Sequence, residues 1–449
     1  MRLNEELRQA IHEAMPGVLE DLRRLVRVPS IANAGYPRET VTESAQVTAD
    51  ILTAAGLQQV RVLDIPGGYP AVYGEIPAPE GAPTVLLYAH HDVQPAGDEA
   101  EWSSPPFELT ERNGRYYGRG AADDKSGIVL HTAVLRAFEG RPPVGIKVII
   151  EGEEEFGDSL EAYVPQHADL FRADAIVVAD MGNKALGLPT LTTTLRGEAS
   201  LVVEVRTLQD RVHSGVFGGA APDALIALSR MLATLHDERG NVAIPGLEGR
   251  PWPVAEDSEE EYRMLAGVLP GVDLIGDGSL ETRLWTSYSV NAVGLDAPTV
   301  RSSANVLINV ARARISLRVP PTDDSRHALG LLEEHLRAVV PWHAQLSFSE
   351  HESGAGFALN AEGPVFAVAQ EALRAAYGHA VGQMGSGGSI PLVSVFSRLY
   401  PQCPVILWGC TDPTARVHAP DESVDPQELE SAALAEAYFL NNLARAITE

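Results

Sequence analysis

The chain has 449 residues, which is too long for one ordinary hydrophobic core and predicts two domains, one of which can be inserted in the other. Lysine and arginine number 34 against 61 acidic residues, so the formal net charge is −27. This charge argues against nucleic acid and anionic membrane surfaces as partners, because phosphate binding depends on a basic face.

The sequence predicts a cytoplasmic protein. It has no apolar run of about 18 residues and no basic start followed by an apolar run, so we expect neither a membrane span nor a signal peptide. The two cysteines, Cys403 and Cys410, are too few for a disulfide framework, which fits a reducing compartment.

Strands alternate with helices over residues 1–193. The apolar periodicity predicts helices at 4–12, 18–28, 39–55, 124–138 and 159–168, the first two separated by Pro16-Gly17. It predicts strands at 59–64, 71–76, 84–89, 145–150 and 175–179. This order is typical of an α/β layered domain with a mostly parallel sheet.

After residue 193 the pattern changes to alternating, half-exposed strands. Strands are expected at 198–207, 306–319 and 345–350, and helices at 222–236 and 325–338. Residues 241–298 are rich in glycine, proline and acidic residues and are interpreted as irregular surface structure. Residues 194–361 are therefore predicted to form a smaller α+β domain.

The last part of the chain returns to the first pattern. An amphipathic segment at 363–377, a glycine-rich turn at 385–389, a buried strand at 404–408 and a long helix at 426–444 follow one another. If this segment completes the first sheet, residues 1–193 and 362–449 form one domain, and residues 194–361 are inserted in it.

The first candidate site closes the buried strand at 84–89. His90 and Asp92 point to one side of that strand and His91 to the other, because side chains alternate along a strand. Ligands tend to bind at the carboxyl ends of strands in open α/β sheets. Since a carboxylate often orients a ligating imidazole, the pair indicates either a metal site or a hydrogen-bonded loop.

Acidic residues recur at the ends of the next elements. Asp123 and Asp124 open the helix at 124–138, where helix capping is the simpler reading. Glu154 and Glu155 follow the strand at 145–150, either in a solvated loop or in the crevice of the sheet. In the crevice, like charges would raise one another's pKa unless a divalent cation compensated them.

Two further residues stand alone after predicted strands. Asp180 follows the strand at 175–179, and His418 follows the strand at 404–408. A lone polar residue after a strand is usually part of an ordinary loop, but the repetition at several element ends indicates a shared site. Mixed imidazole and carboxylate ligands suit zinc, and also manganese or cobalt.

Taken together, these blocks resemble the dinuclear-zinc metallopeptidase family that includes carnosinase, the bacterial dipeptidases, aminoacylase and acetylornithine deacetylase. They run in family order over nearly the whole chain. The matching blocks are His90-His91-Asp92-Val93-Gln94-Pro95, Gly118-Arg119-Gly120, Asp123-Asp124-Lys125, Glu154-Glu155, Asp180, His213-Ser214-Gly215, Gly387-Gly388-Ser389-Ile390-Pro391 and His418-Ala419-Pro420.

The resemblance implies a role for each residue of the site. It gives His90 and Asp180 to one metal ion, Glu155 and His418 to a second, and makes Asp123 the bridge between them. Asp92 would orient His90, and Glu154 would be the general base. The implied cofactors are two divalent ions, zinc first, with manganese or cobalt as alternatives.

The resemblance also implies that residues 1–193 and 362–449 form the catalytic domain and that residues 194–361 form a lid or dimerisation domain, which contributes substrate contacts. His213 would reach the active site of the other subunit, so a homodimer is expected. Asn305 heads the stretch that matches the family's Asn-Val-Ile-Pro, although Ile308 replaces its proline. Arg318 would grip the substrate's carboxylate, and a solvated basic face is the alternative. Gly388 and Ser389 would donate to the same carboxylate end, and a loop without ligand contact is the alternative.

The expected function is hydrolysis of an amide bond in a dipeptide or short peptide with a free carboxylate. The stretches that begin at His213 and Gly387 look carnosinase-like and favour a dipeptidase. The alternatives are an N-acyl amino acid deacylase with the same metal centre and a catalytically silent dimeric binding protein.

Overall fold

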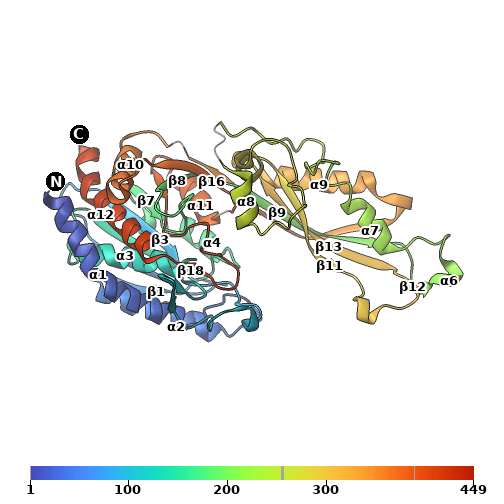
Figure 1. Ribbon diagram of the computed structural model, residues 1–449, viewed down its shortest axis with the longest axis horizontal. Coiled ribbons are helices and arrows are strands. Elements are labelled where there is room, and N and C mark those ends of the chain that lie inside the picture. Colours follow the sequence, from blue (N-terminus) through green and yellow to red (C-terminus); the bar gives the residue numbers. More distant parts are fainter. Residues whose placement is uncertain (1, 254–256, 360, 389, 449) are drawn as a thin grey trace. The chain divides into compact units, whose positions relative to one another are not determined.

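The computed structural model describes residues 2–253, 257–359, 361–388 and 390–448. The chain divides into two compact units, shown in Figure 1. Unit 1 comprises residues 1–193, 359–384 and 392–449, and unit 2 comprises residues 194–358 and 385–391. In the described ranges, no helix combines the length and the apolar character needed to cross a bilayer.

Unit 1 is built on a six-stranded sheet with the order β1-β2-β6-β3-β7-β17. The strands β6, β3, β7 and β17 are parallel to one another, whereas β1 is antiparallel to β2 and β2 is antiparallel to β6. The strands are β1 (Gln58–Leu63), β2 (Ala71–Ile76), β3 (Thr84–His90), β6 (Gly145–Glu151), β7 (Ala175–Val178) and β17 (Val405–Leu407). The predicted mostly parallel α/β sheet is therefore confirmed.

Helices cover both faces of this sheet. One face packs against α1, α2, α3, α10 and α12, whose apolar side chains share one buried cluster with the sheet. On the other face, Tyr73 of β2 contacts Phe171 of α5, which contacts Phe396 of α11. The helices are α1 (Arg2–Val26), α2 (Arg38–Ala54), α3 (Lys125–Ala137), α4 (Ser159–Gln166), α5 (Ala168–Phe171), α10 (Pro364–Tyr377), α11 (Pro391–Leu399) and α12 (Pro426–Thr448).

A small antiparallel sheet, which the sequence did not predict, borders unit 1. Its order is β18-β5-β4, and it joins the tail of the chain to the turn before α3. The strands are β4 (Thr110–Arg112), β5 (Arg115–Tyr117) and β18 (Ser423–Val424). Strands this short carry too little periodicity to be recognised from sequence.

Unit 2 is an antiparallel sheet with the order β11-β13-β9-β14, covered by α7 and α9. Side chains of β9 and β13 alternate between buried and partly exposed, as expected for a sheet with one covered face. The elements are β9 (Gly197–Arg206), β10 (Val212–His213), α6 (Ser214–Phe217), α7 (Ala224–Leu232), α8 (Glu259–Leu265), β11 (Ser289–Asp296), β12 (Val306–Leu307), β13 (Val310–Val319), α9 (Ser325–Val339), β14 (Gln345–Gly354) and β15 (Phe357–Ala358). The strands β8 (Thr190–Leu195) and β16 (Gly382–Ser386) lie where the chain passes from one unit to the other.

The helix break predicted at Pro16 is wrong, because α1 runs through this residue without interruption. A proline inside a helix costs about 3 kcal/mol. Buried apolar side chains on both sides of it, including Ile11, Met15, Val18 and Leu22, each return about 1.5–3 kcal/mol. Burial of one helix face therefore outweighs the lost hydrogen bond.

Two further predictions fail in unit 2. The stretch 241–298 is not irregular throughout, since it holds α8 and the edge strand β11. The strand predicted at 306–319 is broken after β12, where the Ile308 N–H donates to the Asp223 carboxylate instead of to a neighbouring strand.

The boundary between the units also differs from the sequence-based one. Residues 385–391, which the sequence groups with the tail, lie in unit 2, where Gly385 packs closely against Thr194 and Trp285.

Candidate metal centre

The predicted ligands of unit 1 gather at the carboxyl edge of the parallel strands. His90 is the last residue of β3 and pairs with Glu151, the last residue of β6. Glu154 and Glu155 follow β6, and Asp180 follows β7 by two residues. Because these strands are parallel, their ends meet at one edge, which places the imidazole and the carboxylates together.

Asp123 lies in the turn that leads into α3. The next residue, Asp124, caps this helix, since its carboxylate accepts from the N–H of Gly127, and it also accepts from the His90 N–H. Asp124 is therefore the helix cap that the sequence allowed, and it ties the turn to the end of β3. Asp123 is left free to point into the site.

His418 reaches the same site from the tail of unit 1. It has a φ of 63°, in the left-handed region, and its side chain is about half exposed. Its Nε2 atom lies 2.9 Å from Asp123 Oδ2 and 3.2 Å from Glu155 Oε2. The other oxygen of the same aspartate, Asp123 Oδ1, lies 3.0 Å from His90 Nε2.

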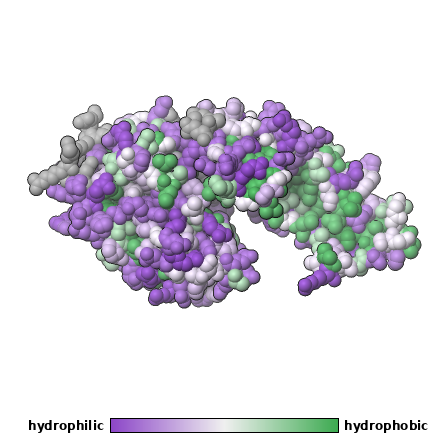
Figure 2. Space-filling model, in the orientation of Figure 1, coloured by the Kyte–Doolittle hydropathy of each residue, from purple (hydrophilic) through white to green (hydrophobic). Residues whose placement is uncertain are grey.

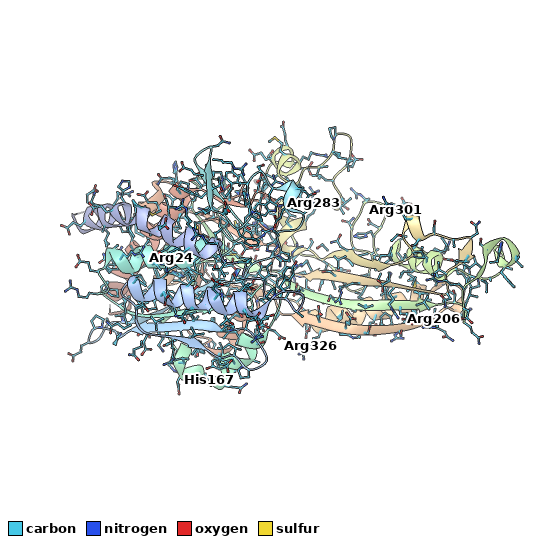
Figure 3. The ribbon with its side chains drawn as sticks, turned by 90° about the horizontal axis from the view of Figure 1, so that it is seen from below. Arg24, His167, Arg206, Arg283, Arg301 and Arg326 are labelled. Carbon is cyan, nitrogen blue, oxygen red and sulfur yellow. The ribbon has the colours of Figure 1, made fainter. Side chains whose placement is uncertain are left out.

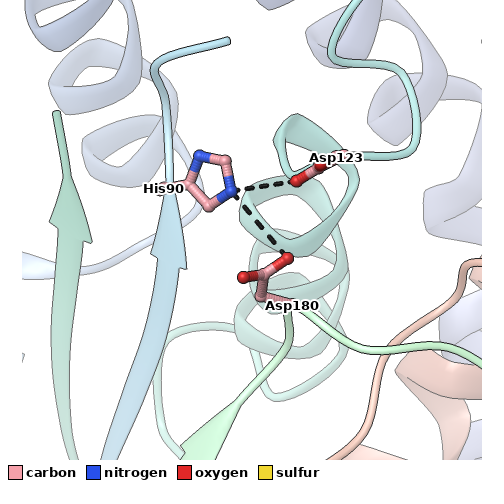
Figure 4. Close-up of side chains that lie close together, drawn as sticks. All are labelled: His90, Asp123 and Asp180. Atoms are coloured by element: carbon pink, nitrogen blue, oxygen red, sulfur yellow. Dashed lines mark hydrogen bonds and ion pairs between the residues drawn. The ribbon is translucent and has the colours of Figure 1, made fainter. Parts of the chain in front are cut away.

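The side chains fall into two sets that share Asp123. The first set is His90, Asp123 and Asp180, shown in Figure 4, in which His90 Nε2 is 3.8 Å from Asp180 Oδ1. The second set is Asp123, Glu155 and His418. Within each set, one ligand atom per residue lies within 4.8 Å of the others. All five residues that the sequence predicted as ligands are thus brought together.

The electrostatics of the site reflect crowded carboxylates and imidazoles. Hydrogen bonds to Asp123 and Glu155 raise the pKa of His418 to about 10. Burial opposes charge on His90, but its hydrogen bonds to Asp123 and Asp92 hold its pKa well above the usual value. Burial and neighbouring carboxylates, Asp124 first among them, raise the pKa of Asp180. The contacts with carboxylates thus favour the protonated form of both imidazoles, His90 and His418.

Asp92 organises the loop that carries the two glutamates. Its Oδ1 and Oδ2 accept from the N–H groups of Glu154 and Glu155, both at 3.1 Å. The same carboxylate is 3.4 Å from His90 Nδ1, the ring nitrogen that faces away from Asp123. His91 points the other way, as predicted, and its Nε2 lies 2.9 Å from the carbonyl of Pro70.

Glu154 lies beside the ligands without belonging to either set. Its Oε2 is 4.0 Å from His90 Nε2, and its side chain is 13% exposed. Burial, with the charges of Asp180, Glu155 and Asp123, raises its pKa well above the usual value, although His90 opposes this shift.

The predicted substrate contacts belong to unit 2. His213 is exposed at the end of β10, and its Nδ1 accepts from the Gly215 N–H at 3.0 Å. Asn305 is next to this strand, since its carbonyl accepts from the Ser214 N–H. Arg318 pairs with Glu198 at 2.8 Å, and the Gly388 N–H donates to Ser386 Oγ. Ser389 lies outside the described residues.

Sequence reasoning missed Glu422, a fully buried residue that holds the turn before α3. Its Oε1 accepts from the N–H groups of Ala122 and Asp123 at 2.9 and 3.0 Å. Its Oε2 accepts from the Gly120 N–H at 3.1 Å and from Arg119 Nη1 at 2.5 Å. The one sequence signal is its place four residues after His418. Gln94 belongs to a matching block but had no role assigned from the sequence, and its Nε2 donates to Glu155 Oε2 at 2.7 Å.

The residues present fit divalent cations. Imidazole nitrogens together with carboxylate oxygens are a donor set that suits zinc, manganese or cobalt. Glu155 Oε1 is buried and has no hydrogen-bond partner among the residues that the structure describes. A buried carboxylate oxygen without a donor is costly, and a bound cation would satisfy it.

The fold and the ligand-rich sheet edge define an enzyme of the peptidase class. The chain belongs to Peptidase family M20/M25/M40, whose family model matches residues 86–442. The resemblance identified from the sequence motifs is therefore confirmed. A curated relative, the cysteinylglycine-S-conjugate dipeptidase of Corynebacterium striatum, is 40% identical over 367 residues, which cover 80% of this chain and 81% of that protein.

Solved structures with the same fold cover almost the whole chain. The structure of human carnosine dipeptidase 1 matches with a TM-score of 0.85 and 26% identity and covers 99% of both chains. The structure of the di-peptidase Dug1p from Saccharomyces cerevisiae matches with a TM-score of 0.87 and 23% identity and covers 98% of both chains. The second likeness concerns the fold alone.

Proposed function

We propose that the chain is a metal-dependent hydrolase that cleaves the amide bond of dipeptides or short peptides with a free C-terminal carboxylate. The observation that carries this proposal is the position of Asp123, with one oxygen 3.0 Å from His90 and the other 2.9 Å from His418. A carboxylate between two imidazoles, with further carboxylates on each side, is an arrangement suited to a pair of cations.

In this proposal each ligand set holds one divalent ion. His90 and Asp180 would hold the first ion, Glu155 and His418 would hold the second, and Asp123 would be shared by both sets. Zinc is the first candidate, with manganese or cobalt as alternatives. When bound, the ions supply Lewis-acid activation of the substrate carbonyl and of the attacking water. Unit 1 is then the catalytic domain.

Glu154 is proposed as the general base and Asp92 as the residue that orients the site. Glu154 would accept a proton from the attacking water and pass it to the leaving amine, and it is the carboxylate beside the ligand sets that belongs to neither of them. Asp92 holds the His90 ring through Nδ1 and fixes the backbone of Glu154 through its N–H. Both roles use contacts within unit 1.

A dipeptide substrate is favoured over an N-acyl amino acid. The relative at 40% identity is named a cysteinylglycine-S-conjugate dipeptidase, and one at 26% identity is the human Beta-Ala-His dipeptidase. A catalytically silent binding protein is disfavoured, because binding alone does not require Glu154 beside five ligand-type residues. S-substituted cysteinylglycine and β-alanyl-histidine are therefore the first substrates to test, with N-acyl amino acids as the competing class.

We propose unit 2 as an inserted lid and dimerisation domain. His213, Asn305, Arg318 and Gly388 are its proposed substrate contacts, and His213 would serve the active site of the partner subunit. Exposed apolar side chains on this unit support a homodimer, and Figure 2 shows hydrophobic surface gathered over part of it. These exposed apolar side chains are Val216, Phe217, Val293, Leu295 and Val300.

The cytoplasmic location stays a prediction.

Chelation and one substitution test the proposal. Removing divalent ions with a chelator should abolish hydrolysis of S-substituted cysteinylglycine, and zinc, manganese or cobalt should restore it. Glu154→Gln should lower kcat by a factor of about 10² or more and leave metal content unchanged. The matched control is Glu139→Gln, an exposed glutamate of the same unit, which should keep full activity.

Either of two results would refute it. Activity that persists in fully metal-free protein would exclude the metal mechanism. Wild-type turnover in Glu154→Gln would show that the base is another residue.

A further inference from the structure

Unit 2 contains a pocket of about 500 Å³ that no proposed step of the hydrolysis uses. It is formed by Arg196, which lies between β8 and β9, by His236 and Tyr262, and by residues within 240–249 and 274–291, the last of which include the beginning of β11. Leu247 and Leu280 line its apolar part, and Ser287 and Ser289 line its polar part. Pockets of this size with a mixed lining are typical of sites for small ligands.

A buried arginine without an acidic partner lines this pocket. Arg196 is only 8% exposed. Its Nη1 donates to Ser289 Oγ at 3.3 Å and its Nε to the Gly387 carbonyl at 3.4 Å, both long hydrogen bonds. Within the described part of the chain, no carboxylate lies within 4.0 Å of this guanidinium. Buried charges are normally paired, since desolvation of a lone charge is costly.

Most of the other charged groups around the pocket are already paired. Arg283 pairs with Glu259 at 2.6 Å, and Asp277 pairs with Arg239 at 2.7 Å. Glu248 lines the pocket from an exposed position, outside ion-pair distance of Arg196.

The charge of Arg196 is therefore uncompensated. Arg318, which repels it, has Glu198 as its own partner. Burial and this repulsion lower the pKa of Arg196 to about 10, which still leaves it protonated at neutral pH.

We propose that this pocket binds a small organic carboxylate with an apolar chain. The carboxylate pairs with Arg196 and accepts from the hydroxyl of Ser289, while the chain lies against Leu247 and Leu280. The planar fork of a guanidinium matches a carboxylate through two parallel hydrogen bonds, which favours this group over other anions. The pocket shares no residue with the metal centre, so this inference does not depend on the proposed hydrolysis.

Calorimetric titration of the full chain with 4-methylpentanoate tests the proposal, because this acid has no amide bond to hydrolyse. Saturable binding is expected, and the neutral 4-methylpentanamide should bind at least about 10-fold more weakly. Arg196→Met should weaken binding of the acid by at least about 30-fold, as for the loss of one partner from a desolvated charge pair. The control is Arg206→Met, which changes the exposed last residue of β9, and it should keep the wild-type affinity. Arg206 and the pocket residue Arg283 are both labelled in Figure 3.

A second variant keeps the test independent of the first. Ser289→Asp places a carboxylate within reach of Arg196, so it should raise Tm and abolish binding of the acid. Three results would each overturn the proposal: unchanged affinity in folded Arg196→Met, wild-type affinity in Ser289→Asp, or equal affinity for the amide. Competition by inorganic phosphate as strong as that of the acid would also overturn it, by showing a site for any anion.

Discussion

Replacing Glu422 with glutamine should lower both the stability of unit 1 and its affinity for metal ions. The glutamate uses two carboxylate oxygens to accept from four donors: three backbone N–H groups and the buried Arg119. Glutamine has one acceptor oxygen, so its NH₂ group must face two of these donors. Each buried donor left without an acceptor costs about 1–3 kcal/mol. Breaking a buried ion pair on one side costs about 3–5 kcal/mol.

We therefore expect Glu422→Gln to lower the free energy of unfolding of the metal-free chain by about 3–5 kcal/mol, measured by urea denaturation. Because Glu422 also holds the N–H of Asp123, metal affinity should fall by about 10- to 100-fold, as for other residues that orient ligands. The affinity is measured by competition with a metal-binding dye.

The matched control is Glu428→Gln. Glu428 is 2% exposed and accepts from Asn183, Tyr377 and the Gly187 N–H, away from the proposed ligands. This variant should lose stability and keep its metal affinity. If Glu422→Gln retained wild-type metal affinity while folded, the reasoning about Asp123 would be refuted.

Two further predictions concern the same centre. Asp92→Asn should lower metal affinity about 10-fold or more, because the amide cannot accept from both the Glu154 and the Glu155 N–H; an unchanged affinity in the dye competition would contradict this. Metal affinity should rise with pH over the range 6–9, because His418, with its pKa raised to about 10, must release its proton to the solvent before it can bind a cation. Calorimetry in buffers of different ionisation enthalpy counts all the protons released on binding, and binding without any proton release would show that His418 is not a ligand.

The positions of the candidate ligands could be predicted because each follows a strand or turn that is visible in the sequence. The apolar runs before His90, Glu154 and Asp180 are buried parallel strands, and parallel strands bring their ends to one edge. Asp123 and His418 also stood at the ends of predicted elements, and the family order of the motifs added their expected roles as ligands. These residues are therefore fixed by local pattern and by the layered fold together.

Other features depend on partners distant in sequence and could not be predicted. Glu422 contacts Asp123 across 299 positions, and nothing in its own segment signals that contact. The edge strand β11 was missed because Val293 and Leu295 are exposed and a register shift between Ala292 and Gly294 interrupts its alternation. Pro16 was misread because its local cost is smaller than the burial around it.

The discontinuous build of unit 1 has a consequence for its synthesis. Residues 392–449 follow unit 2 in the chain, yet α12 packs against α1 and α3 in the core of unit 1. During translation, unit 2 is complete while the first 193 residues still wait for their covering helix. The same late segment carries His418. The second ligand set is therefore completed by the same segment that closes the core, whereas the three residues of the first set all lie within the first 193 residues.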